Sequence, residues 1–269
     1  MLINGVPGDS ISANDRGLLY GDGVFRTMRV HNGLLQNWSR HYQKLLRDCS
    51  ALNLACPPEQ TLFNELGQLI QQQPEGVAKI IITRGTATRG YAPLAHPAPT
   101  RILSIASLPD YPEILNSNGV RLHVCQLKLA HQPRLAGVKH LNRLENVLAA
   151  AEWNDPDIAE GLLFDIHGQL IEATRSNVFL VRGGALFTPD LASCGVAGVQ
   201  RERVVDWARQ QGRPCHIAQL TMQDLLAADE IFLVNSIIGL WPVREMPGFK
   251  RDRHPISLQI QDWLKHESH

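Results

Sequence analysis

Short apolar runs of strand length are interspersed with longer segments of helical periodicity, and the two kinds follow no regular order. The strand-like runs are Gly23–Val30, Ala78–Thr83, Arg101–Ala106, Val120–Leu127, Gly161–Asp165, Asn177–Val181 and Glu230–Asn235. The helix-like segments are Ser39–Leu52, Glu59–Gln73, Leu141–Trp153 and Val199–Gln211. A doubly wound parallel sheet would need strands and helices in regular alternation, so this order predicts a mixed α+β fold.

Chain length and one turn-rich segment predict two domains. A domain typically takes ~100–200 residues, so 269 residues correspond to one large domain or two small ones. Either can bury a core without metal or disulfide staples. Residues 109–119 combine turn formers with weak periodicity. We therefore expect them to connect a smaller N-terminal α/β domain, residues 1–108, to a larger C-terminal α/β domain, residues 120–269.

Composition excludes several classes of protein. A chain that is 44% hydrophobic and 19% charged is not mainly disordered. Its 26 basic residues equal its 26 acidic residues, which argues against nucleic-acid or anionic-membrane partners but not against a local basic pocket for a small anion. The sequence shows neither a secretory signal nor a membrane-spanning stretch of ~18 apolar residues. Its five scattered cysteines indicate free thiols in a reducing cytoplasm rather than disulfides or a zinc site.

Lys139 lies just before a segment of helical spacing. Leu141, Leu144 and Leu148 fall on one side of that helix, so we expect them to form its core face. A lysine before a helix is, in isolation, most often a solvated surface residue. In a partly desolvated pocket, however, a lysine loses its proton readily and can form a Schiff base.

Glu172 and Asn177 flank a polar turn that leads into an apolar strand. Two interpretations stay open at this point. The turn can be a hairpin whose polar groups cap their own backbone. Alternatively, Glu172 supplies a fixed negative charge to a cationic partner such as a protonated pyridine nitrogen.

Small residues, Gly195–Gly198, precede the helix that begins at Val199. Amides at a helix N-terminus, next to a closely approachable glycine, suit a phosphate, although the GK[ST] sequence of a Walker A loop is absent. Further on, the strand Glu230–Asn235 ends in Asn235 and Ser236. These two side chains can bind a phosphate or simply cap the strand.

The combination and order of these segments resemble the fold-type IV pyridoxal-phosphate-dependent enzymes, which include D-amino acid and branched-chain aminotransferases and aminodeoxychorismate lyases. The resemblance runs through Leu2–Gly5, Asp15–Gly17, Tyr20–Gly23 and Trp241–Val243. Three segments resemble the lyase members: Thr83–Gly85, Arg89–Tyr91 and Lys139–Glu145. The resemblance implies a D-amino acid aminotransferase-like fold with a cofactor cleft between its two domains. It also implies pyridoxal 5'-phosphate as cofactor and a homodimer.

By resemblance, Lys139 holds the cofactor covalently and is the catalytic residue, and Glu172 pairs with the pyridine nitrogen. The amides of Val199 and Gln200, together with Ser236, bind the phosphate. Asn177 also belongs to the implied cofactor site.

The resemblance also marks one departure in the first helix. Lys44 stands where the family usually has an arginine that binds the phosphate. Lysine keeps the charge but lacks the two-pronged guanidinium, and Arg47, one turn on, is an alternative.

The reaction implied by the resemblance is conversion of 4-amino-4-deoxychorismate to 4-aminobenzoate and pyruvate, a step of folate synthesis. The substrate carries two carboxylates, so cations and polar groups are needed to bind it. The candidates are Arg84, Arg89, Arg143, Tyr91 and Thr27. Each arginine can equally form a surface ion pair. Two other functions stay open: a D-amino acid or branched-chain aminotransferase, and a catalytically silent protein that binds pyridoxal phosphate.

Overall fold

In a computed structural model of the protein, residues 1–87, 89–94 and 97–267 are described, and the chain divides into two compact units. Unit 1 comprises Met1–Pro109 and Val138–Asn142, and unit 2 comprises Asp110–Gly137 and the chain from Arg143 onward. The division differs from the expected one in two respects. The expected connection, residues 109–119, lies in unit 2 from Asp110 onward, and Val138–Asn142 lies in unit 1 instead of the C-terminal domain.

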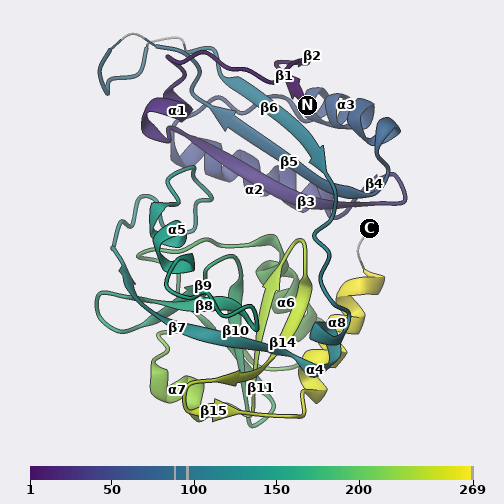
Figure 1. Cartoon of the computed structure of the whole chain (residues 1–269), viewed down its shortest axis with the longest axis vertical. Helices are drawn as coiled ribbons and strands as arrows, with labels where there is room; N and C mark the ends of the chain where they lie inside the picture. Colours follow the sequence, from purple (N-terminus) through teal and green to yellow (C-terminus); the bar gives the residue numbers. More distant parts are fainter. Residues whose placement is uncertain (88, 95–96, 268–269) are drawn as a thin grey trace. The chain divides into compact units, whose positions relative to one another are not determined.

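Unit 1 consists of one sheet and its helices (Figure 1). In the described part of the chain the sheet has the strand order β2-β1-β6-β5-β3-β4. The strands are β1 (Leu2–Ile3), β2 (Val6–Pro7), β3 (Gly23–His31), β4 (Leu34–Leu35), β5 (Gly76–Thr83) and β6 (Thr100–Ala106). The helices are α1 (Arg16–Tyr20), α2 (Trp38–Ala51) and α3 (Glu59–Gln72). Helices α2 and α3 pack on the sheet because Leu45, Leu62 and Leu66 share one core with Met28 and Ile80.

The segment Val138–Asn142 joins unit 1 through backbone pairing that sequence spacing does not reveal. The Phe25 N–H donates to the Lys139 carbonyl over 3.0 Å, and the Leu141 N–H donates to the Gly23 carbonyl over 3.0 Å. Val138 is buried in the unit 1 core. The segment therefore extends the edge of β3, and Lys139 is held on the unit that contains α2.

A curled mixed sheet forms the centre of unit 2, with order β12-β11-β10-β13-β14-β7-β8-β9 among the described residues and β15 paired with β14. Its strands are β7 (Val120–Leu129), β8 (Ile158–Asp165), β9 (Leu170–Ala173), β10 (Asn177–Arg182), β11 (Ala185–Pro189), β12 (Cys215–Ala218), β13 (Glu230–Asn235), β14 (Gly239–Met246) and β15 (Phe249–Lys250). Its helices are α4 (Ile114–Asn118), α5 (Leu144–Ala150), α6 (Val199–Gln210), α7 (Met222–Leu226) and α8 (Pro255–His266). The α+β class is confirmed, and α4 stands within the segment expected to be a plain connection.

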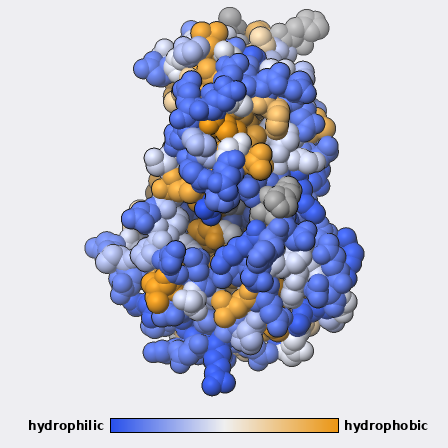
Figure 2. Space-filling view, turned by 90° about the vertical axis from the view of Figure 1, so that its right-hand side faces the viewer, coloured by the Kyte–Doolittle hydropathy of each residue, from blue (hydrophilic) through white to orange (hydrophobic). Residues whose placement is uncertain are grey.

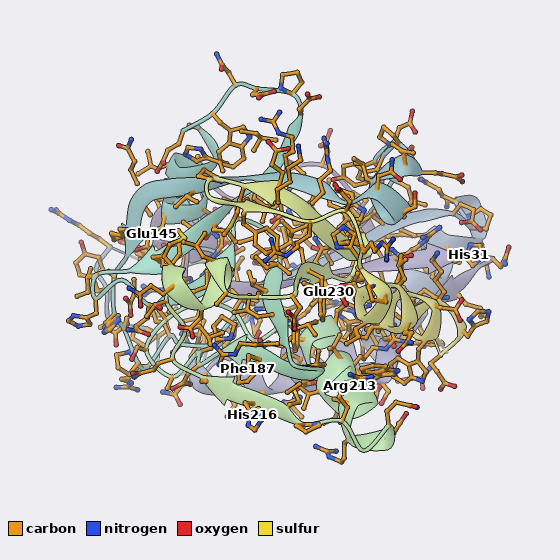
Figure 3. The ribbon with its side chains drawn as sticks, turned by 90° about the horizontal axis from the view of Figure 1, so that it is seen from below. His31, Glu145, Phe187, Arg213, His216 and Glu230 are labelled. Carbon is orange, nitrogen blue, oxygen red and sulfur yellow. The ribbon has the colours of Figure 1, made fainter. Side chains whose placement is uncertain are left out.

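Strand β13 shows why the middle of this sheet is apolar on both faces. Ile231 and Leu233 belong to one core, while Phe232 and Val234 belong to another that includes α6 and α8. Successive side chains of a strand point to opposite faces, so a strand covered on both sides reads as a continuous apolar run. Glu230 at its start accepts from the backbone N–H groups of Ile256 and Ser257, which ties α8 to the sheet (Figure 3).

A ring contact joins the edge strand β12 to its neighbour β11 in the same sheet. Phe187 of β11 and His216 of β12 are register partners, and their rings stack with centroids 5.0 Å apart (Figure 3).

No helix among the described residues is long and apolar enough to cross a membrane. In the view of Figure 2, hydrophilic residues cover most of the surface and hydrophobic residues form separate patches.

The core face expected for the helix after Lys139 is wrong. Leu144 is 75% exposed and Leu148 is 60% exposed on α5, whereas Ala149 is buried. Leu141 does not belong to the helix at all, because it pairs with β3 in unit 1. A helix was expected over Leu141–Trp153; α5 is shorter, Leu144–Ala150, and its buried side is the one that carries Ala149.

Candidate active site

Lys139 is fixed by its backbone and lies over an aromatic ring. Its Nζ is 4.4 Å from the centroid of the Phe25 ring, and the residue is half-buried. Gly23 makes the backbone pairing here possible, because a Cβ at this position would lie 2.4 Å from the Ile82 carbonyl oxygen and 2.9 Å from Leu141 Cδ1. The structure thus places Lys139 in a partly desolvated setting, with its amine over the Phe25 ring.

Lys44 and Arg47 lie in different environments of helix α2. Lys44 is buried, and its Nζ lies 2.6 Å from Asp48 Oδ1, whereas Arg47 is exposed. Asp48 Oδ2 accepts the backbone N–H of Lys139 over 3.1 Å. Lys44 is therefore connected through one carboxylate to the segment that carries Lys139.

Arg84 is buried in an ion-pair network of unit 1. It donates to both carboxylate oxygens of Asp22 over 2.8 and 2.9 Å and to the carbonyls of Leu52 and Asn53 over 2.8 Å. Burial alone would raise the pKa of Asp22, but hydrogen bonds and charge from Arg84 and Arg16 hold that pKa below its usual value. This arrangement favours a structural role for Arg84 over the expected contact with substrate.

The other expected substrate residues of unit 1 lie at its surface. Arg89 is exposed and Tyr91 is 83% exposed. The Arg16 guanidinium donates to the Tyr91 carbonyl over 2.7 Å and so holds this loop. Thr27 is half-buried and stands two residues after Phe25 on β3, so both side chains lie on one face of the strand.

In unit 2, Glu172 is a buried carboxylate with a fixed orientation. It lies in β9, and its Oε2 accepts the backbone N–H of Val196 over 2.7 Å. This bond comes from the loop that precedes α6. A carboxylate held in this way can present a fixed negative charge to a cationic ring nitrogen.

Asn177 shapes the same loop from the other side. Its Nδ2 donates to the Val196 carbonyl over 2.7 Å, and its Oδ1 accepts the Gly198 N–H over 3.1 Å. Gly198 is the N-cap of α6, so Val199 and Gln200 are its first residues. The first N–H groups of a helix have no intrahelical acceptor and point outward, which suits an anion. Asn177 thus shapes the turn at the start of α6, whose amides could bind a phosphate.

The turn after β13 separates the roles of Asn235 and Ser236. The Asn235 Oδ1 accepts the N–H groups of Ile237 and Ile238 over 2.8 and 3.0 Å, and its Nδ2 donates to Ser176 Oγ over 2.9 Å. Asn235 therefore caps the strand end. Ser236 is half-buried within this turn.

Arg143 stands at the start of α5, half-buried. Burial lowers the pKa of its guanidinium, and the carboxylates of Glu172 and Glu145 oppose that shift. Arg143 is consequently coupled by charge to the buried carboxylate of the candidate site.

Asp48 and Phe25 were not expected from the sequence, although both contact Lys139. The i,i+4 spacing of Lys44 and Asp48 on a helix could have indicated their pairing. The bond from Asp48 to the Lys139 amide could not, since these residues are far apart in the chain.

One group of described residues could hold a metal ion: His123, Cys125 and Glu152. The Glu152 carboxylate already accepts the N–H groups of Gln126 and Leu127 over 2.6 and 2.9 Å. Burial, helped by Glu152, raises the pKa of the Cys125 thiol to about 12, which opposes thiolate formation. We interpret this group as structural: it stabilises β7 where its pairing with β8 is irregular.

Comparison with known proteins covers nearly the whole chain. Residues 23–246 match the family model described as amino-transferase class IV. The chain is 35% identical over 242 residues to an aminodeoxychorismate lyase of Vibrio harveyi, covering 90% of this chain and 89% of the relative. A crystal structure of 4-amino-4-deoxychorismate lyase from Pseudomonas aeruginosa superposes with a TM-score of 0.95 at 44% identity, covering 99% of this chain and 98% of the other.

A branched-chain amino acid aminotransferase from Escherichia coli shares the fold. It superposes with a TM-score of 0.88 at 21% identity, covering 96% of this chain and 90% of the other.

Proposed function

The chain belongs to the aminotransferase class IV family, and on this premise we propose that it is a pyridoxal-phosphate-dependent lyase. Its reaction is the conversion of 4-amino-4-deoxychorismate to 4-aminobenzoate and pyruvate, which serves folate synthesis. The observation that carries the proposal is the full-length similarity, in sequence and in structure, to proteins named as this lyase. We place this enzyme of folate synthesis in the cytoplasm.

The residues present fit the cofactor. In unit 2, a phosphate would be bound by the first amides of α6, at Val199 and Gln200, together with Ser236. The resemblance to the family assigns the Lys44 ammonium of unit 1 to the phosphate as well. Gly198 is needed by the loop itself, since a Cβ on it would lie 2.4 Å from Asn177 Oδ1. Glu172 would pair with the pyridine nitrogen, and Lys139 Nζ would hold the cofactor covalently.

When bound, pyridoxal 5'-phosphate supplies an electron sink for the carbon that bears the substrate amine. Lys139 Nζ would take the proton from that carbon as general base. Glu172 would stabilise the positive charge of the protonated pyridine nitrogen. Its carboxylate is held in place by the Val196 N–H. Breaking the C–O bond to the enolpyruvyl group on the adjacent carbon would leave an aromatic ring and release enolpyruvate, which takes up a proton at its CH₂ carbon to become pyruvate.

For the substrate carboxylates we favour Arg143 and Arg89 over Arg84. Arg84 already donates to Asp22 and to two carbonyls, and moving it would break these part-buried hydrogen bonds. Arg143 lies within the electrostatic reach of Glu172. Thr27 and Tyr91 would add polar contacts.

We also propose that two copies of the chain form a homodimer. Helix α5 exposes a row of large apolar side chains, at Leu144, Val147 and Leu148. A second copy, which carries the same face, would cover them in a self-complementary interface.

The test combines spectroscopy with an assay. Purified protein loaded with pyridoxal 5'-phosphate should show the visible absorbance of a lysine-bound cofactor and should make 4-aminobenzoate from 4-amino-4-deoxychorismate without an added keto acid. Lys139→Ala should lose both properties. Lys79→Ala is the matched control, because Lys79 Nζ lies 5.6 Å from the same Phe25 ring and should be dispensable. Dependence on a keto acid would instead identify an aminotransferase, and a bound cofactor without any turnover would identify a silent binding protein.

A further inference from the structure

Two cationic side chains and one backbone amide converge on the carboxylate of Asp48. Asp48 lies in α2 and is 1% exposed. Its Oδ1 lies 2.6 Å from Lys44 Nζ. Its Oδ2 contacts Arg26 Nη2 from β3 and accepts the Lys139 N–H over 3.1 Å. Helix, sheet and the Lys139 segment of unit 1 therefore meet at one carboxylate.

The two ion pairs explain how an ionised carboxylate can be buried here. An isolated buried charge is strongly unfavourable, whereas paired and hydrogen-bonded charges are tolerated. The order of the pair, with Lys44 before Asp48, is the weaker orientation for stabilising a helix. Asp48 therefore contributes little to the stability of α2 by itself. Its role lies in its tertiary contacts.

The third contact concerns the reactive lysine directly. Lys139 is held at its N–H by Asp48, at its carbonyl by the Phe25 N–H, and at its side chain by the Phe25 ring. Of these three, the bond to Asp48 is the only one made by an ionised side chain. A charged acceptor makes a stronger hydrogen bond than a neutral one, so this bond contributes most to fixing the lysine backbone.

We propose that Asp48 is a positioning residue for Lys139, and that it aligns Lys44 with Lys139 by binding the Lys44 ammonium at Oδ1 and the Lys139 N–H at Oδ2. This inference rests on the proposed attachment of the cofactor at Lys139, but it does not depend on which substrate is used. A displacement of ~1 Å in a reacting group can cost ~10²-fold in rate, so a loosened Lys139 segment should react measurably more slowly.

Three variants test this role. Asp48→Asn keeps the shape and removes the charge. Asp48→Glu keeps the charge and moves the carboxylate by one methylene, so it decides the question if Asp48→Asn does not fold. Glu65→Gln is the matched control, because Glu65 is a buried carboxylate of the same unit that pairs with Arg101 over 2.7 Å.

Two readouts separate positioning from general stability: hydrogen exchange of the Lys139 amide in the apoprotein, and the rate at which added pyridoxal 5'-phosphate attaches. We expect both Asp48 variants to exchange faster at Lys139 and to attach the cofactor ~10–100-fold more slowly. Glu65→Gln should lower the melting temperature but leave both readouts at wild-type values. Wild-type exchange and attachment in the Asp48 variants would overturn the proposal, as would equal changes in Glu65→Gln. Normal attachment without formation of 4-aminobenzoate in the wild-type protein would count against the lyase function alone.

Discussion

Gly198 lies so close to Asn177 that a Cβ on it would be 2.4 Å from Asn177 Oδ1, the atom that accepts the Gly198 N–H. The Asn177 side chain therefore leaves room only for glycine at the N-cap of α6. The amides of Val199 and Gln200 owe their orientation to this contact.

Gly198→Ala should weaken cofactor binding with little loss of folded protein. The added methyl group must displace Asn177 or the start of α6, and the amides would no longer meet the phosphate together. Hydrogen bonds to a charged group contribute ~1.5–3 kcal/mol each, so we expect the Kd for pyridoxal 5'-phosphate to rise ~10–100-fold in a spectrophotometric titration.

Gly67→Ala is the control for this glycine substitution. Gly67 lies within α3, and a Cβ on it would have nothing within 4 Å, so alanine should stabilise the protein by ~1 kcal/mol and leave the Kd unchanged. An unchanged Kd in Gly198→Ala would contradict the phosphate site at α6.

Glu172→Gln should reduce turnover while the cofactor stays bound. The amide can still accept the Val196 N–H but cannot carry the negative charge that balances the ring nitrogen. We expect kcat to fall ~10²–10³-fold, as when another preorganised electrostatic group is removed. Glu230→Gln is the control, since this buried carboxylate of the same unit stabilises α8 and should affect melting temperature rather than kcat. A kcat near the wild-type value in Glu172→Gln would remove Glu172 from the site.

Arg84→Met should destabilise the protein more than it affects substrate binding. A hydrogen bond to a charged group contributes ~1.5–3 kcal/mol, and we expect a loss of this size because half-buried Asp22 would keep Arg16 as a partner. Arg89→Met, at an exposed position, should change the free energy of unfolding by less than ~0.5 kcal/mol. Denaturant unfolding checks both values. A stable Arg84→Met protein with a greatly raised KM would restore Arg84 as a substrate-binding residue.

Asp22 should make the stability of the protein sensitive to acid. Its pKa in the folded protein lies below the ordinary value of 3.8, because the hydrogen bonds from Arg84 and Arg16 outweigh the effect of burial. The stabilisation is therefore present above the unfolded-state pKa and is lost as the pH falls through the folded-state pKa. Wild-type protein should lose free energy of unfolding below about pH 4, and Asp22→Asn should show a smaller loss over the same range. Equal pH dependence in the two proteins would mean that Asp22 is not the titrating group.

The elements that sequence predicts well are those whose signals are local. The bounds of β13 were predicted correctly, and α2, α3 and α6 were predicted to within two residues at each end, because their apolar period and flanking prolines or glycines lie in the same segment. The placement of Val138–Asn142 needed a pairing with β3 across more than a hundred residues. Spacing along the chain carries no information about such a contact.

The candidate site follows the same distinction. Lys139, Glu172 and the small residues before α6 could be chosen from residue type and order, because their chemistry is local to short motifs. That Arg84 is engaged by Asp22, and Lys44 by Asp48, depends on which side chains the fold brings together. Sequence therefore supplied the candidate site residues, but not the side chains that contact them in the fold.

Helix α5 shows the limit of periodicity most directly, and it gives the last prediction. An apolar face indicates that something covers it, but not whether the cover is the same chain or a second copy. Burying a large apolar side chain contributes ~1.5–3 kcal/mol, so Leu144, Val147 and Leu148 together could stabilise a dimer substantially. Leu144→Lys combined with Leu148→Lys should shift the protein to monomer in sedimentation velocity without unfolding it, because both positions are exposed in the single chain. Ile217→Lys, on the exposed edge strand β12, should leave the assembly unchanged. A double variant that sediments like the wild-type dimer would place the interface elsewhere.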